Sequence, residues 1–389
     1  MNPSTLPRFR LRGRALLPVV QGGMGVGVSA HRLAGHVARC GGMGTIASVD
    51  LRRLHPDLME ATGRSRDRTE IENANLIALD REIRAALTIA DGQGAVAVNV
   101  MRAVSQYETL VRQAGESGAH AVVMGAGLPL DLPDLAADYP DLALVPILSD
   151  ARGVNLLLKK WMRKQRLPDA IVIEHPRHAG GHLGAARAED IEDPRFDFAN
   201  VVPAVMTIFE QLGIEPGRIP LIVAGGINSF DQVRELLALG ASAVQLGTAF
   251  AVTEEGDAHP VFKQVLAEAE PADVFTFMSV AGLPARAVRT PWLERYLRRE
   301  HKLQAAASIA HKCTLGWDCL VSCGLRDGLH KAGQFCIDNQ LAAALRGDLE
   351  KGLFFRGAAR LPFGKAIRPV RELIEYLTTG RFPASGQSA

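Results

Sequence analysis

The sequence predicts an α/β fold, a (β/α)8 TIM barrel followed by a helical C-terminal extension. Eight short runs rich in Val, Ile and Ala alternate with longer amphipathic segments, as in a buried parallel sheet covered by helices. The repeats occupy about 230 residues, which is the size of such a barrel. From Pro260 onward the strand pattern disappears, and the chain becomes helical in character and rich in Arg and Leu.

The predicted strands are three to six residues long and are separated by turn and helix signals. They are Val19–Gln21, Thr45–Ala47, Ala95–Asn99, Ala121–Met124, Ala143–Leu148, Ala170–Ile173, Leu221–Ala224 and Ala243–Leu246. Three of the helices between them are Ser29–Arg39, Asp150–Lys164 and Ser229–Leu239. We expect Ser29 and Ser229 to cap two of these helices, and Gly240 to end the last one.

The predicted barrel spans residues 15–259, with a long polar insertion at about 51–71, after its second strand. The extension, residues 260–380, is expected to pack on the barrel. It carries four of the five cysteines of the chain.

A Rossmann fold is the alternative. Gly25, Gly27 and Ala30 fit the GxGxx(G/A) fingerprint of dinucleotide-binding proteins, and Asp50 follows at the distance of a ribose-binding acid. The preceding Gly22-Gly23 pair and the count of eight strands fit that fold less well, so we favour the barrel.

The composition excludes several classes of protein. With 47% hydrophobic residues, the chain can bury a core and is not disordered as a whole. Its 44 Lys and Arg residues against 42 Asp and Glu residues give a net charge of +2, which provides no basis for binding nucleic acid or acidic membranes. The odd number of cysteines indicates a reducing compartment.

No targeting segment is expected. The basic N-terminus leads into the apolar run Leu16–Val20, which is too short for a signal peptide. No run of ~18 apolar residues occurs anywhere in the chain. We therefore expect a cytoplasmic protein, and the sequence leaves a homodimer open.

Four predicted strands end in glycine-rich turns. The turns are Gly22-Gly23-Met24-Gly25, Gly125-Ala126-Gly127, Gly225-Gly226 and Gly247-Thr248. In a parallel barrel they share the face where active sites form. The last two follow strands seven and eight, where backbone N–H groups commonly bind a phosphate. The sequence therefore predicts a phosphate site at these two turns.

A histidine-rich stretch follows the sixth strand. It contains Glu174, His175, His178 and His182 within nine residues. Imidazole and carboxylate groups suit Zn or Fe, but the Ala-Gly-Gly between the last two histidines indicates a loop and not a helix face. Histidines without a role are a second alternative. We favour one histidine on a glycine-rich turn that exchanges a proton beside a phosphate-bearing cofactor.

Six motifs occur together and in chain order. They are Gly22-Gly23-Met24-Gly25, Gly41-Gly42-Met43-Gly44, Asn99 at a strand end, Ala179-Gly180-Gly181-His182-Leu183-Gly184, Ala224-Gly225-Gly226-Ile227 and Gln245-Leu246-Gly247-Thr248-Ala249-Phe250. The set resembles the nitronate monooxygenase (2-nitropropane dioxygenase-like) family, which also includes FMN-dependent enoyl-ACP reductases. The resemblance covers residues 15–290 and lies in the combination, because no single motif is specific.

The resemblance implies a TIM barrel that binds FMN. The cofactor-binding residues that it implies are Gly22, Gly23, Met24, Asn99, Glu174, Gly180, Gly181, Gly225, Gly226, Gln245, Gly247 and Thr248. The first turn and Asn99 would contact the flavin, and the last two turns would cradle its phosphate. His182 matches the catalytic histidine of the family and would act as a base or as a hydrogen-bond partner of the nitro or nitronate group.

The chain departs from the family pattern at three places. Gly22-Gly23-Met24 stands where an Ala-Pro-Met type turn is common, and His178 stands where a Glu often precedes the AGGH motif. Glu174 fits a variant of the form EGPxAGGHLG, in which His175 replaces a Gly. The cysteine-bearing extension resembles the same variant subgroup.

Three functions are compatible with these observations. The first is a nitronate monooxygenase that oxidises alkyl nitronates with O2. The alternative is an FMN-dependent reductase that uses NAD(P)H on an enoyl-ACP or quinone substrate. The third is a metal-binding regulatory protein that uses the cysteines of the extension.

The cysteines of the extension do not match a known metal motif. They are Cys313, Cys319, Cys323 and Cys336. Their spacing, C-x5-C-x3-C-x12-C, lacks the paired knuckles of zinc ribbons and the run of bacterial ferredoxins, so no metal ligand is assigned. Buried cysteines acting as small hydrophobes are the alternative. Arg286 and Arg289 are also unassigned, since they could bind an anion or pack the extension.

Overall fold

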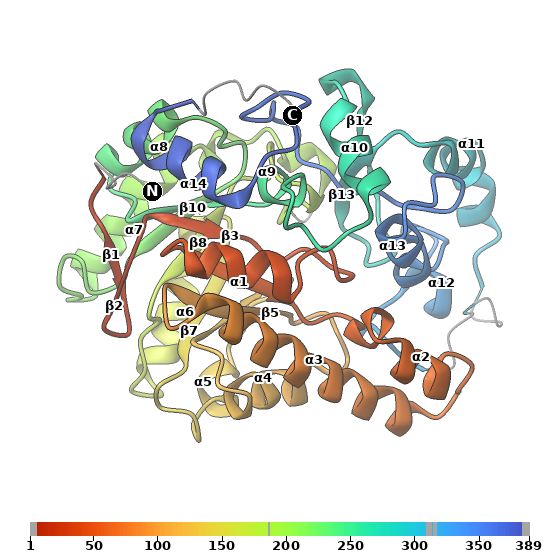
Figure 1. Ribbon diagram of the computed structural model, residues 1–389, viewed down its shortest axis with the longest axis horizontal. Helices are drawn as coiled ribbons and strands as arrows, with labels where there is room; N and C mark the ends of the chain where they lie inside the picture. The colour runs from red at the N-terminus through yellow and green to blue at the C-terminus, as the bar shows by residue number, and fades with distance from the viewer. Residues whose placement is uncertain (1–5, 186, 309–312, 314–316, 383–389) are drawn as a thin grey trace.

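Eight parallel strands close into a barrel, in which β3 pairs with both β4 and β11 (Figure 1). The computed structural model describes residues 6–185, 187–308, 313 and 317–382. The barrel strands are β3 (Val19–Gln21), β4 (Met43–Ala47), β5 (Ala95–Met101), β6 (Ala121–Gly125), β7 (Ala143–Leu148), β8 (Ile171–Glu174), β10 (Leu221–Ala224) and β11 (Ala243–Leu246). The predicted TIM barrel is confirmed, and each predicted strand agrees with an observed one to within two residues at either end.

Helices cover the outside of the barrel. Up to the last barrel strand and its short helix they are α1 (His31–Arg39), η1 (Leu51–Leu54), α2 (Pro56–Thr62), α3 (Arg68–Ala90), α4 (Tyr107–Glu116), α5 (Leu132–Leu135), α6 (Ala151–Met162), η2 (Ala188–Asp190), η3 (Pro194–Phe196), α7 (Phe198–Gln211), α8 (Phe230–Ala238) and α9 (Thr248–Ala251). Ser229 caps α8 as predicted, because its side chain accepts the N–H of Gln232. In the described part of the chain, none of the helices has the length and apolarity needed to span a bilayer.

Small aliphatic side chains fill the inside of the barrel. Ala95, Ala97 and Val123 belong to an inner cluster of buried residues from the strands. The hairpin of β1 (Phe9–Leu11) and β2 (Arg14–Leu16) adds its own buried side chains to that cluster. A core of this kind needs few rings, which agrees with the 5% aromatic content of the chain.

The stretch predicted as an insertion, about residues 51–71, is helical. It contains η1, α2 and the start of α3, which packs beside α1. The carboxylate of Glu82 in α3 lies 2.8 Å from Nδ1 of His31 and 3.1 Å from Nε2 of His55. Burial alone would raise the pKa of Glu82, but the hydrogen bonds from the two histidines outweigh it and lower the pKa to about 2. This buried carboxylate therefore ties the stretch to the barrel helices.

The extension contains strands as well as helices. Its elements are α10 (Pro260–Glu268), η4 (Pro271–Asp273), β12 (Val274–Met278), β13 (Pro284–Val288), α11 (Pro291–Ala305), α12 (Gly324–Asp327), α13 (Ile337–Leu345) and α14 (Val370–Thr379). The strand β13 pairs antiparallel with β12 and with β9 (Gly181–His182), which belongs to the histidine-rich stretch. The predicted C-terminal helices are confirmed, and the two strands between them were not predicted, because β12 and β13 depend on pairing with each other and with the distant β9.

The last helix of the chain returns to the barrel. The helix α14 packs against α1, α8 and β3, as its position beside α8 in Figure 1 shows. Its apolar side chains Leu373, Ile374 and Leu377 are buried in the same core as the strands and helices of the barrel. Residues 252–369 are therefore placed between the last barrel strand and the helix that completes the outer ring.

The expected helix cap Ser29 was wrong. The cap position of α1 is Ala30, and Oγ of Ser29 instead accepts the backbone N–H of Met24 at 2.8 Å. Asp257, far along the chain, satisfies the helix end. Its carboxylate accepts the N–H groups of Ala30 (2.8 Å), Arg32 (3.1 Å) and Leu33 (3.1 Å).

Replacing Asp257 by Ala should destabilise the protein, because three helix-end N–H groups lose their acceptor. We expect a cost of about 1–3 kcal/mol, measured as a fall in the thermal unfolding midpoint. The matched control is Ser229→Ala, which removes one cap bond at α8 and should cost about 1 kcal/mol. An unchanged midpoint in the Asp257 variant would contradict the assignment.

Candidate active site

A cavity of about 670 Å³ lies at the carboxyl ends of the barrel strands. The predicted site residues on its walls are Gly22, Gly23, Met24, Asn99, Glu174, Gly180, Gly181, His182, Gly225, Gly226, Gln245, Gly247 and Thr248. Every residue proposed from the sequence therefore lines one space. The extension forms a further part of the wall, which the sequence did not indicate, with Phe262, Leu266, Leu283, Trp317, Cys319, Leu320, Asp338 and Phe355.

The first turn, Gly22 to Met24, is held against the neighbouring strands. The N–H of Gly22 donates to the carbonyl of Leu246 at 2.9 Å. A Cβ on Gly23 would lie 2.3 Å from Cβ of Asn99, so only glycine fits there. The amide Nδ2 of Asn99 donates to the carbonyl of Val123 at 3.2 Å, which leaves Oδ1 on the side of Gly23.

Several buried polar atoms of the cavity wall lack a partner among the described residues, and two of them belong to strand ends of the barrel. Oε1 of Gln245 and Oγ of Ser48 are buried, and neither has a hydrogen-bond partner in the described part of the chain. Both residues line the cavity. Because an unsatisfied buried polar atom costs about 1–3 kcal/mol, such atoms indicate groups that a ligand would satisfy.

The two turns predicted to bind phosphate lie against the histidine-rich stretch and the extension. Gly226 has φ +80°, and a Cβ there would lie 2.8 Å from the ring of His178. The hydroxyl of Thr248 accepts the N–H of Gly357 at 3.1 Å. A Cβ on Gly180 would lie 2.5 Å from the same Gly357 nitrogen. The extension therefore packs directly over the two turns.

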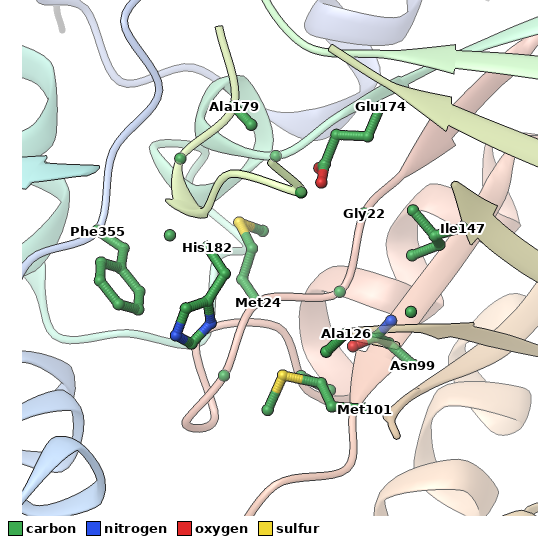
Figure 2. A pocket seen from close by; sticks show the side chains of 18 of the residues that line it. Gly22, Met24, Asn99, Met101, Ala126, Ile147, Glu174, Ala179, His182 and Phe355 are labelled. Atoms are coloured by element: carbon green, nitrogen blue, oxygen red, sulfur yellow. The ribbon is translucent and has the colours of Figure 1, made fainter. Parts of the chain in front are cut away.

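His182 is positioned by the pairing of β9 with β13, opposite Ala285. Its Nε2 lies 2.9 Å from Oγ of Ser279, which also accepts the N–H of Ala281 at 3.2 Å. The ring of Phe355 packs edge-on against His182 at 6.0 Å (Figure 2). Burial lowers the pKa of His182 to about 4, so the ring is neutral at pH 7.

Ser279 was not singled out from the sequence. It lies in the turn between β12 and β13, is fully buried, and reaches His182 across 97 positions in the sequence. A single serine in an apolar segment carries no local signal for such a contact. The pairing of β13 with β9 would have been needed to find it.

Glu174 ends β8 and points its carboxyl group into the cavity (Figure 2). Burial raises the pKa of Glu174 to about 7. No hydrogen bond or ion pair of this side chain occurs with the described residues. The carboxyl group is therefore partly protonated near neutral pH, when it can donate or accept a hydrogen bond.

The structure does not bring the three histidines together as metal ligands. Nε2 of His175 lies 3.1 Å from Oδ1 of Asp197, and its ring packs against His178 at 4.9 Å. His182 instead faces Ser279. The zinc or iron alternative drawn from this stretch has no support in these contacts.

The two unassigned arginines hold the extension in place. Arg286 is buried, and its guanidinium donates to the carbonyls of Ala179 at 2.7 Å and Pro176 at 3.3 Å. Arg289 packs over the ring of Phe275 at 5.1 Å. Of the two alternatives for these residues, the contacts favour packing, and Arg286 also fixes the loop that carries the histidines.

Known proteins share both the sequence pattern and the fold. A family model described as nitronate monooxygenase matches residues 14–380. A probable nitronate monooxygenase of Bacillus subtilis is 27% identical over 287 residues, which is 71% of this chain and 78% of that protein. A probable nitronate monooxygenase of Staphylococcus saprophyticus is 28% identical over 126 residues, so the match spans 32% of this chain and 33% of that relative.

Two solved structures resemble the whole fold. FabK from Thermotoga maritima has a TM-score of 0.61 at 23% identity, with 92% of this chain and 91% of that chain covered. Nitroalkane oxidase from Streptomyces ansochromogenes has a TM-score of 0.62 at 20% identity, with 93% and 94% covered. At these identities the likeness concerns the fold.

The stability of the protein should show two opposing pH dependences from this cavity, measured after bound small molecules are removed. The pKa of His182 is lowered from 6.5 to about 4, so the unfolded state binds more protons in that range and stability rises with pH. The pKa of Glu174 is raised from 4.5 to about 7, so the folded state binds more protons and stability falls with pH. The two effects largely cancel in the natural protein.

Glu174→Gln should therefore unmask a rise of the thermal midpoint between pH 4 and 6.5, and His182→Gln should unmask a fall between pH 4.5 and 7. Each variant serves as the control of the other. Identical pH profiles for the two variants would contradict the burial of these groups.

Proposed function

The chain belongs to the nitronate monooxygenase family of flavin-dependent oxidoreductases, and we propose that it binds FMN in the cavity and oxidises alkyl nitronates with O2. The observation that carries the cofactor assignment is the wall of the cavity. It combines glycines that admit no Cβ with buried polar atoms that have no partner in the described part of the chain. A flat cofactor with several donors and acceptors would satisfy these atoms, while the glycines let neighbouring segments of the wall pack closely.

The residues divide into a ring-binding set and a phosphate-binding set. The backbone of Gly23 and Met24, with the side chains of Asn99 and Gln245, would hold the flavin ring. The phosphate would be held by the backbone of the Gly225-Gly226 and Gly247-Thr248 turns, where short loops lead into helices. Because Gly180 and Gly181 have no side chains, the strand that carries His182 could lie close to the flavin.

Bound FMN supplies the electron transfer, and the protein supplies orientation and proton handling. His182 is neutral near pH 7 because of its burial. In the tautomer whose Nε2–H donates to Ser279, the other ring nitrogen, Nδ1, carries a lone pair that can accept a proton from the α-carbon of a nitroalkane or hydrogen-bond to the nitro group once protonated. Ser279 therefore sets which ring nitrogen faces the substrate.

The charge state of the cavity supports a nitro or nitronate ligand. His182 and Glu174 are both uncharged over part of the neutral range, so neither side chain then places a negative charge beside a nitronate anion. The protonated form of Glu174 can donate a hydrogen bond to a cofactor or substrate oxygen. The exclusion of water by the extension strengthens these hydrogen bonds.

We expect His182→Ala to retain FMN but to lose turnover by about 10²–10⁴-fold, because the proton-accepting nitrogen is removed. The measurement is kcat with a neutral nitroalkane, whose α-proton must be removed, together with FMN content per chain. The control is His301→Ala, which removes an exposed histidine in α11 and should leave both values unchanged. An unaltered kcat in His182→Ala would falsify the catalytic assignment.

A second experiment separates the proposed activity from the reductase alternative. Anaerobic protein is mixed with an alkyl nitronate, NADH or NADPH, and the loss of flavin absorbance is followed. We expect the nitronate to reduce the flavin. Reduction by NADH or NADPH but not by the nitronate would favour an enoyl-ACP or quinone reductase. Colourless protein that FMN cannot reconstitute would contradict the cofactor assignment.

A further inference from the structure

The cysteines of the extension are not used by the proposed oxidation. Cys313, Cys319, Cys323 and Cys336 all lie in the part of the chain placed between the last barrel strand and α14. The fifth cysteine, Cys40, ends α1 on the outside of the barrel. The contacts of the first group therefore need a separate account.

The fold brings two cysteine-bearing segments into direct contact. The N–H of Gly324 donates to the carbonyl of Val280 at 2.6 Å, and the N–H of Gly333 donates to the neighbouring carbonyl of Ser279 at 2.8 Å. A Cβ on Gly324 would lie 2.6 Å from Cβ of Ala332. The segment of Cys323 and the segment that leads to Cys336 therefore lie side by side, and both are hydrogen-bonded to the turn between β12 and β13. In Figure 1, α12 and α13, which follow these two cysteines, lie next to each other.

The segments of Cys319 and Cys336 border the same space. Cys319 lines the cavity together with Trp317, and Ile337, which directly follows Cys336, lines it as well. The thiols of Cys313, Cys323 and Cys336 are close enough to Cys319 to interact with it electrostatically.

Buried polar atoms without a partner surround the same group. Nε1 of Trp317 and Oδ1 of Asp338 are buried and have no hydrogen-bond partner in the described part of the chain. Trp317 and Asp338 are 7% and 4% exposed, and both line the cavity together with Cys319. Cys336 occupies the cap position of α13, a helix whose first backbone N–H groups have no acceptor within the helix. An indole N–H and helix N–H groups are donors suited to sulfide or thiolate sulfur.

The side chains of the described residues do not form a site for a single metal ion. Within residues 6–185, 187–308, 313 and 317–382, no three His, Cys, Asp or Glu side chains converge closely enough to hold one metal ion. The thiolates of a [4Fe–4S] cluster each bind a different iron, so they are spread more widely than ligands of one zinc. Zinc also commonly uses paired CxxC knuckles, which the spacing here lacks.

We propose that Cys313, Cys319, Cys323 and Cys336 bind an iron–sulfur cluster beside the cavity, whose wall includes Cys319. Asp338 links this site to the barrel, because Arg53 of η1 donates to its carboxylate and also to Asp50 at 2.5 Å. The proposal concerns metal binding alone, so it stands or falls independently of FMN and of the nitronate activity.

The test is the iron and acid-labile sulfide content of the whole chain, purified without O2 and reconstituted with Fe²⁺ and sulfide. We expect about 4 iron and about 4 sulfide per chain, and an EPR signal after reduction with dithionite. Cys319→Ser and Cys336→Ser should lose most of the iron while the matched control, Cys40→Ser, keeps it. Full iron content in both test variants, zinc in place of iron, or no metal at all would overturn the proposal.

A measurement on the unaltered protein covers variants that fail to fold. Alkylation of the reconstituted protein in its native state, read by mass spectrometry, should label four more thiols after chelator treatment than before it. Unchanged labelling after chelation would also overturn the assignment. The FMN content of each variant is recorded in parallel, so that loss of the flavin site is distinguished from loss of metal.

Discussion

The pairing of β9 with β13 is the contact on which the rest of the site depends. A barrel alone leaves the loop after β8 without partners, because its backbone lies beyond the strand ends. Here Gly181 and His182 pair with Arg286 and Ala285. The side chain of Arg286 then holds the carbonyls of Pro176 and Ala179. One short strand therefore fixes the histidine-bearing loop, covers the cavity and brings Ser279 to the imidazole.

Burial shifts the pKa values of His182 and Glu174 in opposite directions, but both shifts favour the neutral form. It lowers the pKa of His182 and raises the pKa of Glu174, so each group favours its neutral form. Two neutral, buried groups screen charge that develops on a neighbouring ligand only weakly. This property suits chemistry in which a nitro group gains or loses negative charge.

The barrel could be predicted because its signals are local. Each strand is a short run of Val, Ile or Ala next to a turn, and the glycines at strand ends must share one face in any parallel barrel. The thirteen predicted site residues line one cavity for the same reason. Contacts between distant segments could not be predicted, since Asp257 at the start of α1 and Ser279 at His182 carry no local pattern. The expectation for Ser29 failed because a local cap rule competed with a tertiary contact, the bond to Met24.

The position of α14 changes how the extension should be understood. Because α14 closes the ring of barrel helices beside α1 and α8, residues 252–369 are an excursion within the barrel and cannot come away as a separate C-terminal domain. Both ends of that excursion are anchored in the barrel core, which restricts how far its cysteines can move from the cavity. Cys319 and Trp317 line the cavity together with His182 and Gln245. A metal centre at the cysteines would therefore sit in a fixed relation to the catalytic face, which a flexible appendage could not provide.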